Sequence, residues 1–370
     1  MPVKPARVRP VSLGAVRGCG VRCAVNLATE RAAVVAVMAC ALVAGCTRAG
    51  APAAAGSPAG APFVYVTGKG GTNEISQFAT LGSGALRPLT PRNVASGEFP
   101  YDIAVSPRGA SAYAVDNLSN TTGAVSQYTI NPATGKLTPM PPRTVAGAGS
   151  PIGIKVAPDG RYLYITTGTQ CLAAKGTHAA CASASTKANT VSVFRISPGT
   201  GALSAKPVQT VATGHNPQMI TIAPDGKSAY VTATNDSTIW QYRINPATGK
   251  LTPMSPAAVA TGRGPHDLAI TPDGKNLYII TVADSTVAQY RINPATGALS
   301  AKPASTAATV LHPEAIALAP DGKNAYVTSG NYAGLSQFAI SPTTGKITPL
   351  SPATVTIPSG SLGLAITPAK

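Results

Sequence analysis

A short motif recurs along most of this chain and restricts the folds open to it. Tyrosine followed by Val-Thr, Ile-Thr or a close variant opens six segments, at Tyr65, Tyr113, Tyr164, Tyr230, Tyr278 and Tyr326. Most segments continue with a Gln-Tyr or Gln-Phe strand, an Asn/Ser-Pro-x-Thr-Gly turn and a Pro-Asp-Gly turn, and the last three are each about 48 residues long. Strand-like alternation and turn residues dominate, and no stretch reads as a long amphipathic helix. The repeats therefore predict an all-β fold, a β-propeller with one four-stranded blade per unit.

The order of strands within the units predicts how the propeller closes. The strand before each Pro-Asp-Gly turn is expected to be innermost, at 101–106, 152–157, 218–223, 266–271, 314–319 and 362–367. The tyrosine strand follows it, and is expected at 63–67, 112–115, 162–166, 228–232, 276–281 and 324–328. The chain thus begins on a second strand and ends on an inner strand. We expect six blades, with the C-terminal strand completing the N-terminal blade and leaving no unpaired edge; a seven-bladed ring is the alternative.

The Tyr-Val-Thr and Pro-Asp-Gly repeats resemble the YVTN/lactonase-type β-propeller family, which includes 6-phosphogluconolactonases and carboxymuconate lactonizing enzymes. The resemblance extends over residues 63–370. It implies a hydrolase for small lactones that needs no metal and no cofactor. The motifs are strand and turn residues, so they identify the fold more firmly than the activity. Enzymes of this family typically have seven blades, and the sequence offers no residues for a seventh.

The start of the chain has the pattern of an export signal. Arg31 precedes an apolar stretch, 32–45, which is too short to cross a bilayer and fits the core of a signal peptide. It ends in Leu42-Val43-Ala44-Gly45-Cys46, which resembles a lipobox. We expect residues 1–46 to be a signal peptide with lipidation at Cys46, 47–62 a flexible Ala/Gly/Pro linker, and 63–370 the propeller. Ordinary signal cleavage near Ala53 is the alternative.

The loops on the two faces of the propeller differ in how much they vary. The Pro-Asp-Gly and Asn-Pro-Ala-Thr-Gly turns on one face are nearly constant, whereas the loops that enter the inner strands, on the other face, vary from unit to unit. Eight acidic residues and three histidines map to this variable face, which is where binding function usually lies in a repeated scaffold. The sequence therefore predicts a polar funnel there, although polar loops also arise from solvation alone.

Three residues of the funnel are candidates for lactone hydrolysis. His266 is the candidate general base, Glu314, expected across the channel from it, a candidate acid or base, and Arg263 a candidate cation for an anionic substrate or oxyanion. The other candidate ligand-binding residues are Tyr101, Asp102, His215, Gln218, Asp267 and His312. Because successive residues of a strand point to opposite faces, Asp267 is expected to bond backbone groups rather than to orient His266.

Two cysteines remain beyond the signal segment and Cys46. Cys171 and Cys181 lie in one long insertion, 169–190, between strands of a single unit. An even pair in an exported chain predicts a disulfide. A three-ligand metal site with His178 is the alternative.

Two classes of function stay open. One is a lactonase-like hydrolase; the other is a non-catalytic scaffold of the cell envelope that binds a protein, peptide or glycan on the variable face. The net charge of +16 does not favour nucleic acid, because part of the excess precedes Cys46 and the remaining basic residues are scattered singly. We expect a monomer, attached to a membrane through its lipid and facing the periplasm or the cell exterior.

Overall fold

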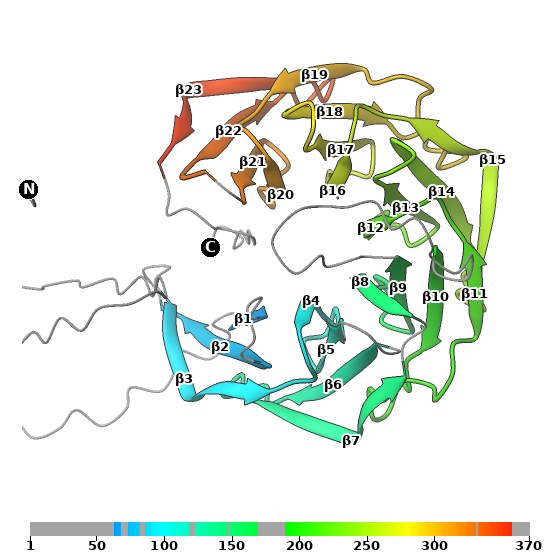
Figure 1. Ribbon diagram of the computed structural model, residues 1–370, viewed down its shortest axis with the longest axis vertical. Helices are drawn as coiled ribbons and strands as arrows, with labels where there is room; N and C mark the ends of the chain where they lie inside the picture. Colours follow the sequence, from blue (N-terminus) through cyan, green and yellow to red (C-terminus); the bar gives the residue numbers. More distant parts are fainter. Residues whose placement is uncertain are drawn as a thin grey trace, which may run out of the picture. The chain divides into compact units, whose positions relative to one another are not determined.

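A computed structural model describes residues 63–67, 73–81, 86–117, 123–146, 149–168, 189–330 and 332–356. The described residues form 23 strands in six antiparallel sheets and no helix (Figure 1). Five sheets have four strands, and the first has three, β1 to β3. This confirms the prediction of an all-β propeller of six blades. The fourth strand expected for the first blade, 362–367, lies outside the described residues and stays a prediction.

The strands follow the chain from the innermost to the outermost in each complete sheet. The first sheet holds β1 (Phe63–Thr67), β2 (Glu74–Thr80) and β3 (Leu86–Ala95). The second holds β4 (Pro100–Val105), β5 (Ser111–Asp116), β6 (Ala124–Ile130) and β7 (Leu137–Ala146). The third holds β8 (Ser150–Val156), β9 (Tyr162–Gly168), β10 (Thr190–Arg195) and β11 (Gln209–Ala212). The fourth holds β12 (Pro217–Ile222), β13 (Ser228–Ala233), β14 (Thr238–Ile244) and β15 (Leu251–Ala260). The fifth holds β16 (Pro265–Ile270), β17 (Asn276–Thr281), β18 (Thr286–Arg291) and β19 (Ser305–Ala308), and the sixth β20 (Pro313–Leu318), β21 (Asn324–Ser329), β22 (Leu335–Ile340) and β23 (Ile347–Val355).

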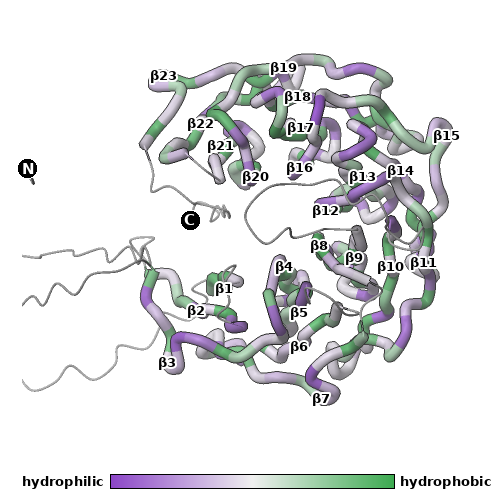
Figure 2. The backbone as a smooth tube through the Cα atoms, in the orientation of Figure 1, coloured by the Kyte–Doolittle hydropathy of each residue, from purple (hydrophilic) through white to green (hydrophobic). Residues whose placement is uncertain are grey.

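The inner strands adjoin one another around the channel. β4 contacts β8, β8 contacts β12, β12 contacts β16, and β16 contacts β20. The starts predicted for these strands from the sequence agree with the observed starts to within two residues. Apolar clusters fill the spaces between neighbouring sheets: Tyr113 and Val115 of the second sheet, for example, pack with Leu163 and Phe194 of the third. Figure 2 shows hydrophobic residues within every sheet, and several of the second strands, such as β5, β9, β13 and β17, are buried along their whole length, as expected where both faces of a sheet pack against neighbours.

The repeated turns are built from side chains that bond to their own backbone. Asn131 accepts N–H bonds from Ala133 and Thr134 through Oδ1, at 3.0 and 2.9 Å, and Gly135 ends that turn with φ of 71°. Asn245 and Asn293 form the same turn in later sheets. Glycine is suited to the left-handed conformation, and asparagine supplies the local acceptor. The near-constant face is therefore explained by local turn chemistry.

The recurrent tyrosine fastens each sheet to the next. Its hydroxyl donates to the carbonyl of the turn glycine in the following sheet: Tyr65 to Gly135, Tyr113 to Gly201, Tyr164 to Gly249, Tyr230 to Gly297 and Tyr278 to Gly345, at 2.5 to 2.9 Å. Burial raises the pKa of Tyr230 to about 12, so the hydroxyl stays protonated and can donate. The hydroxyl of Tyr326, which is half-buried in β21, makes no hydrogen bond to the part of the chain that the structure describes. The motif that defines the repeat is thus a bond between blades.

Buried glutamines make a second connection between sheets. Gln241 donates from Nε2 to the carbonyl of Pro256 in its own sheet, at 2.8 Å, and accepts the N–H of Leu299 in the next sheet at 2.9 Å. Gln127 makes the equivalent pair of bonds to Pro142 and Leu203. Because each amide satisfies buried backbone groups of two blades, the Gln-Tyr part of the repeat also specifies how blades join.

The tyrosine bonds can be tested with a matched pair of variants. Tyr230→Phe leaves the Gly297 carbonyl without its donor, so we expect the free energy of unfolding to fall by about 1 to 3 kcal/mol. Tyr326→Phe removes the same hydroxyl from the equivalent position of β21 and is expected to cost clearly less. Urea denaturation followed by circular dichroism measures both, and equal losses would contradict the assignment.

Candidate functional site

The candidate site lies where the variable loops enter the inner strands. Each described inner strand has a proline as its first residue or, in β8, as its second. The residue after this proline, here called the first position, is Tyr101, Ile152, Gln218, His266 or Glu314. The residue before the proline has positive φ in four of them, Phe99, Asn216, Gly264 and His312, and in β8 the positive φ falls one residue earlier, at Gly149. Pairing with the second strand shifts register just after the proline in all five sheets, as between Pro265 and Leu268. Such irregularities re-aim side chains and are frequent beside active sites.

His266 is held by a backbone group of the neighbouring blade. Its Nδ1 lies 3.0 Å from the carbonyl oxygen of Glu314. A carbonyl oxygen can only accept, so Nδ1 carries the proton and, in the neutral ring, Nε2 is left with its lone pair. The two residues lie on adjoining strands, β16 and β20, so the expectation that Glu314 stands across the channel from His266 is wrong. The carboxylate of Glu314 lies against Gly330, at whose position any Cβ would be 3.2 Å from Oε2.

Asp267 bridges the same two strands, and Asp102 repeats its geometry elsewhere in the ring. Asp267 accepts the N–H of Leu268 at 2.8 Å and that of Ile316, in β20, at 3.0 Å. Asp102 accepts the N–H of Ile103 at 2.8 Å and that of Ile154, in β8, at 3.1 Å. Both carboxylates therefore bond backbone, as strand alternation predicts for Asp267.

The two carboxylates share the channel with a lysine. Burial raises the pKa of Asp102 to about 6 against the opposing N–H bonds; the charge of Asp267 raises it further, and that of Lys155 lowers it. Burial likewise raises the pKa of Asp267, which the N–H bonds and the charges of His266 and Lys155 oppose. β8, which carries Lys155, is separated from β16 by β12, so the charge of Lys155 acts on Asp267 from a strand that is not its neighbour.

Threonines make the corresponding bridge at other junctions of the ring. Thr166 accepts the N–H of Gly153 and donates to the carbonyl of Gln218 at 2.5 Å; Thr232 accepts the N–H of Met219 and donates to the carbonyl of His266 at 2.8 Å. Thr67 donates to the carbonyl of Tyr101 at 3.3 Å. In the two sheets bridged by aspartate, Val115 and Ile280 stand in place of the threonine. Sequence reasoning missed this exchange, although the replacement of Thr by Val or Ile in the two Asp-containing units is its signal.

One junction lacks a described acceptor. Thr328 stands in β21 at the position of Thr166 and Thr232, and its buried Oγ1 has no hydrogen-bond partner. The next inner strand in the ring would be the one expected at 362–367. That strand lies outside the described residues, so the closure of the first blade stays a prediction.

Arg263 and His215 occupy equivalent positions on two entrance loops. Arg263 bonds Asp284 through Nε at 2.8 Å, and the backbone N–H of Arg263 donates to the same carboxylate at 2.6 Å. His215 pairs with Asp236 in the same way, at 2.8 and 2.7 Å. Their side chains are 77% and 73% exposed, so each pair adds little stability but fixes the direction of the side chain at the rim.

The remaining candidates also line the entrance. Gln218 donates to Asn216 Oδ1 at 3.0 Å, and Tyr101 packs against the core between the second and third sheets. His312 stacks on Tyr332 with ring centroids 5.9 Å apart, beside the exposed Leu311. Leu311, His312 and Tyr332 together form an exposed lip on the sixth sheet, made by the loop before β20 and the connection from β21 to β22.

Asp116 is a buried carboxylate. It is one of the eight acidic residues that the sequence assigns to the variable face, without a role of its own. Ser126 donates to its Oδ2 at 2.6 Å, while Oδ1 is buried without a hydrogen-bond partner. Burial raises the pKa of Asp116 to about 6. The carboxyl therefore exchanges its proton near neutral pH, although it lies at the end of β5 and not in the channel.

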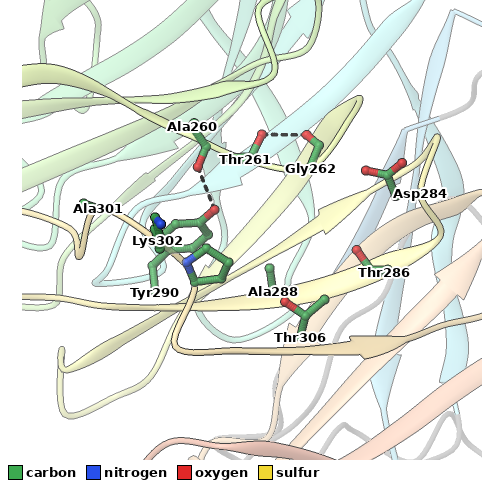
Figure 3. Close-up of a pocket in the computed structure, with 11 residues that line it drawn as sticks. Ala260, Thr261, Gly262, Asp284, Thr286, Ala288, Tyr290, Ala301, Lys302 and Thr306 are labelled. Atoms are coloured by element: carbon green, nitrogen blue, oxygen red, sulfur yellow. Dashed lines mark hydrogen bonds between the residues drawn. The ribbon is translucent and has the colours of Figure 1, made fainter.

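A cavity of about 380 Å³ lies away from these residues, between the fourth and fifth sheets (Figure 3). It is lined mainly by small residues of β15, β18 and β19, such as Ala288 and Thr306, with Tyr290 donating to the carbonyl of Ala260 at 2.8 Å. Asp284 lines the cavity and also binds Arg263, which lies at the rim of the entrance. None of the predicted site residues lines it, so the cavity lies apart from the candidate site.

Several predicted residues lie outside the described part of the chain. These are Cys46, Cys171, His178 and Cys181, so lipidation, the disulfide and its metal alternative stay predictions, as do the segments 1–46 and 47–62. Within the described ranges, no cluster of three or more His, Cys, Asp or Glu side chains could hold a metal ion. Nor does any described segment form a helix that is long and apolar enough to span a bilayer.

The family model described as "Lactonase, 7-bladed beta-propeller" matches residues 63–260 and 255–358. The chain belongs to this family. The model has seven blades, whereas the described residues of this lactonase-family protein form six sheets. No protein with a curated function matches the chain.

Solved structures show the same fold. A proposed 6-phosphogluconolactonase of Bacteroides fragilis superposes with a TM-score of 0.67 at 24% identity, covering 83% of this chain and 84% of its own. The periplasmic gluconolactonase PpgL of Pseudomonas aeruginosa gives 0.63 at 21% identity, covering 77% and 80%. The hydrazine synthase of Kuenenia stuttgartiensis gives 0.54 at 18%, covering 77% and 82%. Such different proteins on one architecture mean that this likeness shows the fold alone.

The raised carboxyl pKa values predict how stability depends on pH. Asp102 and Asp116 titrate near pH 6 in the folded protein, against an ordinary value of 3.8. Between about pH 4 and 6 the folded state therefore holds more protons than the unfolded chain, so their contribution falls as pH rises through that window. For Asp116 the change is at most roughly 3 kcal/mol. Asp116→Asn should flatten the pH dependence of the urea midpoint over this range, and an unchanged slope would refute the shift.

Proposed function

We propose that this protein is a lactone hydrolase whose catalytic centre is His266 with Glu314 at the mouth of the channel. The observation that carries the proposal is the bond from His266 Nδ1 to the Glu314 carbonyl, which leaves Nε2 as an acceptor. Membership of the lactonase family and the half-buried position of the imidazole at the entrance support it. Neither a metal nor a cofactor is required by the chemistry proposed.

In this mechanism His266 acts first as a base and then as an acid. Nε2 takes a proton from a water molecule while the water oxygen attacks the lactone carbonyl carbon. The tetrahedral oxyanion collapses, the ring C–O bond breaks, and the departing alkoxide receives the proton from Nε2. The product is the open hydroxy acid, and His266 returns to its neutral form. The Glu314 carbonyl, which keeps Nδ1 protonated, also stabilises the imidazolium formed between the two steps.

Glu314 and Arg263 take the supporting roles in the proposal. The backbone carbonyl of Glu314 anchors His266, and the carboxylate of the same residue positions the attacking water. Arg263 is oriented by Asp284 through Nε, and its two Nη atoms have no hydrogen-bond partner among the described residues. They are therefore the donors proposed for the oxyanion or for a carboxylate of the substrate. Tyr101, Gln218 and the His312–Tyr332 lip surround the entrance and contact the rest of the lactone.

The site of action proposed is outside the cytoplasm. The pattern ending at Cys46 supports export with a lipid anchor, and the similar fold of PpgL, a periplasmic gluconolactonase, is consistent with an extracytoplasmic lactonase. The short segment 47–62 would place the propeller close to the membrane surface, where it acts as a monomer on a diffusing lactone.

The proposal predicts that hydrolysis depends on His266 and on the carboxylate of Glu314. With the purified full chain, His266→Ala should lower kcat/KM by about 100-fold or more on the lactone that the wild type hydrolyses best. Glu314→Gln keeps the backbone carbonyl that anchors His266, so its expected loss, about tenfold or more, reports the carboxylate itself. A panel of phosphorylated, sugar and acyl lactones, followed by pH-stat titration, measures both.

Lys250→Ala, in a turn on the near-constant face, is the matched surface control and should hydrolyse at the wild-type rate. Hydrolysis of no lactone above the buffer rate would contradict the enzyme proposal and favour the envelope scaffold. Hydrolysis that survives His266→Ala would place the chemistry elsewhere in the channel.

A further inference from the structure

Neighbouring inner strands are bridged either by a threonine or by an aspartate. The kind of bridge decides whether a threonine hydroxyl donates to the first-position carbonyl of the next inner strand. A threonine of the second strand donates to the first-position carbonyl of the next inner strand, as Thr166 does to Gln218 and Thr232 to His266. An aspartate of the inner strand instead accepts an N–H two residues further along, as Asp102 does from Ile154 and Asp267 from Ile316. The aspartate bridge therefore leaves the first-position carbonyl of the next strand without a threonine donor.

At the junction of β16 and β20 the available carbonyl is that of Glu314. It accepts Nδ1–H of His266 at 3.0 Å. Had this sheet followed the threonine pattern, a hydroxyl at position 280 would be directed to that oxygen; the residue there is Ile280, fully buried. Asp267 also sits next to His266 in the chain and ties β20 to β16 only two residues beyond Glu314. One side chain thus bridges the two strands at a junction where no threonine competes with His266 for the Glu314 carbonyl.

We propose that Asp267 is the positioning residue of the site: by bridging β16 to β20 it keeps the Glu314 carbonyl on His266 Nδ1 and so holds Nε2 in its proton-accepting form. This inference rests on the proposed function for its catalytic consequence, whereas the tautomer itself can be observed without any substrate. Asp267 does not touch the lactone. It acts through His266, and its negative charge lies beside the ring when the imidazolium forms.

The chain supplies its own control for the substitution. Asp102 makes the same two backbone bonds at the junction of β4 and β8, but its neighbour is Tyr101 and the next first position is Ile152. Asp267→Asn and Asp102→Asn each lose one accepted N–H bond, so their unfolding midpoints should fall by similar amounts. A difference between them at His266 therefore reports positioning and not general loosening of the ring.

The test is nitrogen-15 NMR of histidine-labelled full chain at pH 8, with His266→Gln to assign the signals. In the wild type and in Asp102→Asn, Nδ1 of His266 should give the signal of a protonated ring nitrogen and Nε2 that of an unprotonated one. In Asp267→Asn the two signals should move toward the averaged values of a free imidazole. On the best lactone, kcat of Asp267→Asn should fall at least tenfold with KM changed less than twofold.

A second variant covers failure of Asp267→Asn to fold. Asp267→Met with Ile280→Thr reproduces the Met219 and Thr232 pair of the fourth sheet, which restores a bridge but directs a hydroxyl to the Glu314 carbonyl. Loss of the fixed tautomer in this folded double variant supports the inference. Wild-type ring signals in either variant overturn it, whether or not any lactone is hydrolysed. Averaged signals without lactone hydrolysis by the wild type would reject the proposed function and leave the positioning intact.

Discussion

Side-chain bridges at the junctions of inner strands hold the centre of this propeller together. Strands of adjacent blades are not paired through their backbones, so the edge of each inner strand presents N–H and C=O groups that need other partners. Thr67, Asp102, Thr166, Thr232 and Asp267 each supply that partner at one of five junctions. The direction of every first-position side chain, and hence the shape of the entrance, depends on these bonds.

The outer part of the ring is joined by different means. Tyrosine hydroxyls reach the turn glycines of the following sheet, and glutamine amides join the backbones of two sheets. These groups are buried and fully used by backbone partners, which is why the repeat preserves them in nearly every unit. The chemistry of the site is confined to the entrance loops and the first residues of the inner strands, where the units differ.

Much of the architecture could be predicted from the sequence because it depends on local patterns. Two-residue alternation, Pro-Asp-Gly turns and the recurrent tyrosine specify strands and turns within one unit, and counting them gives six blades. The same registration placed His266 and Glu314 at the entrance. Their relation could not be predicted, because the register shift after Pro265 changes which groups meet and because the partner of the ring is a backbone oxygen. The pairing of Arg263 with Asp284 likewise joins two loops whose proximity no local pattern reveals. The exchange of Thr for Asp could have been predicted by aligning the units, because Val115 and Ile280 occupy the position that is threonine in the other units.

The two kinds of bridge also bear on how such a ring can change over time. Aspartate with Val or Ile, and threonine with Gly or Met, are alternative solutions at equivalent junctions of near-identical blades. Exchanging one for the other takes two replacements and leaves turns, tyrosines and glutamines untouched. A histidine that precedes a bridging aspartate can donate from its ring to the first-position carbonyl of the next inner strand. At a threonine bridge that carbonyl already accepts the threonine hydroxyl. A chain grown by duplication of one blade can therefore acquire, relocate or lose a reactive imidazole blade by blade while its scaffold stays the same.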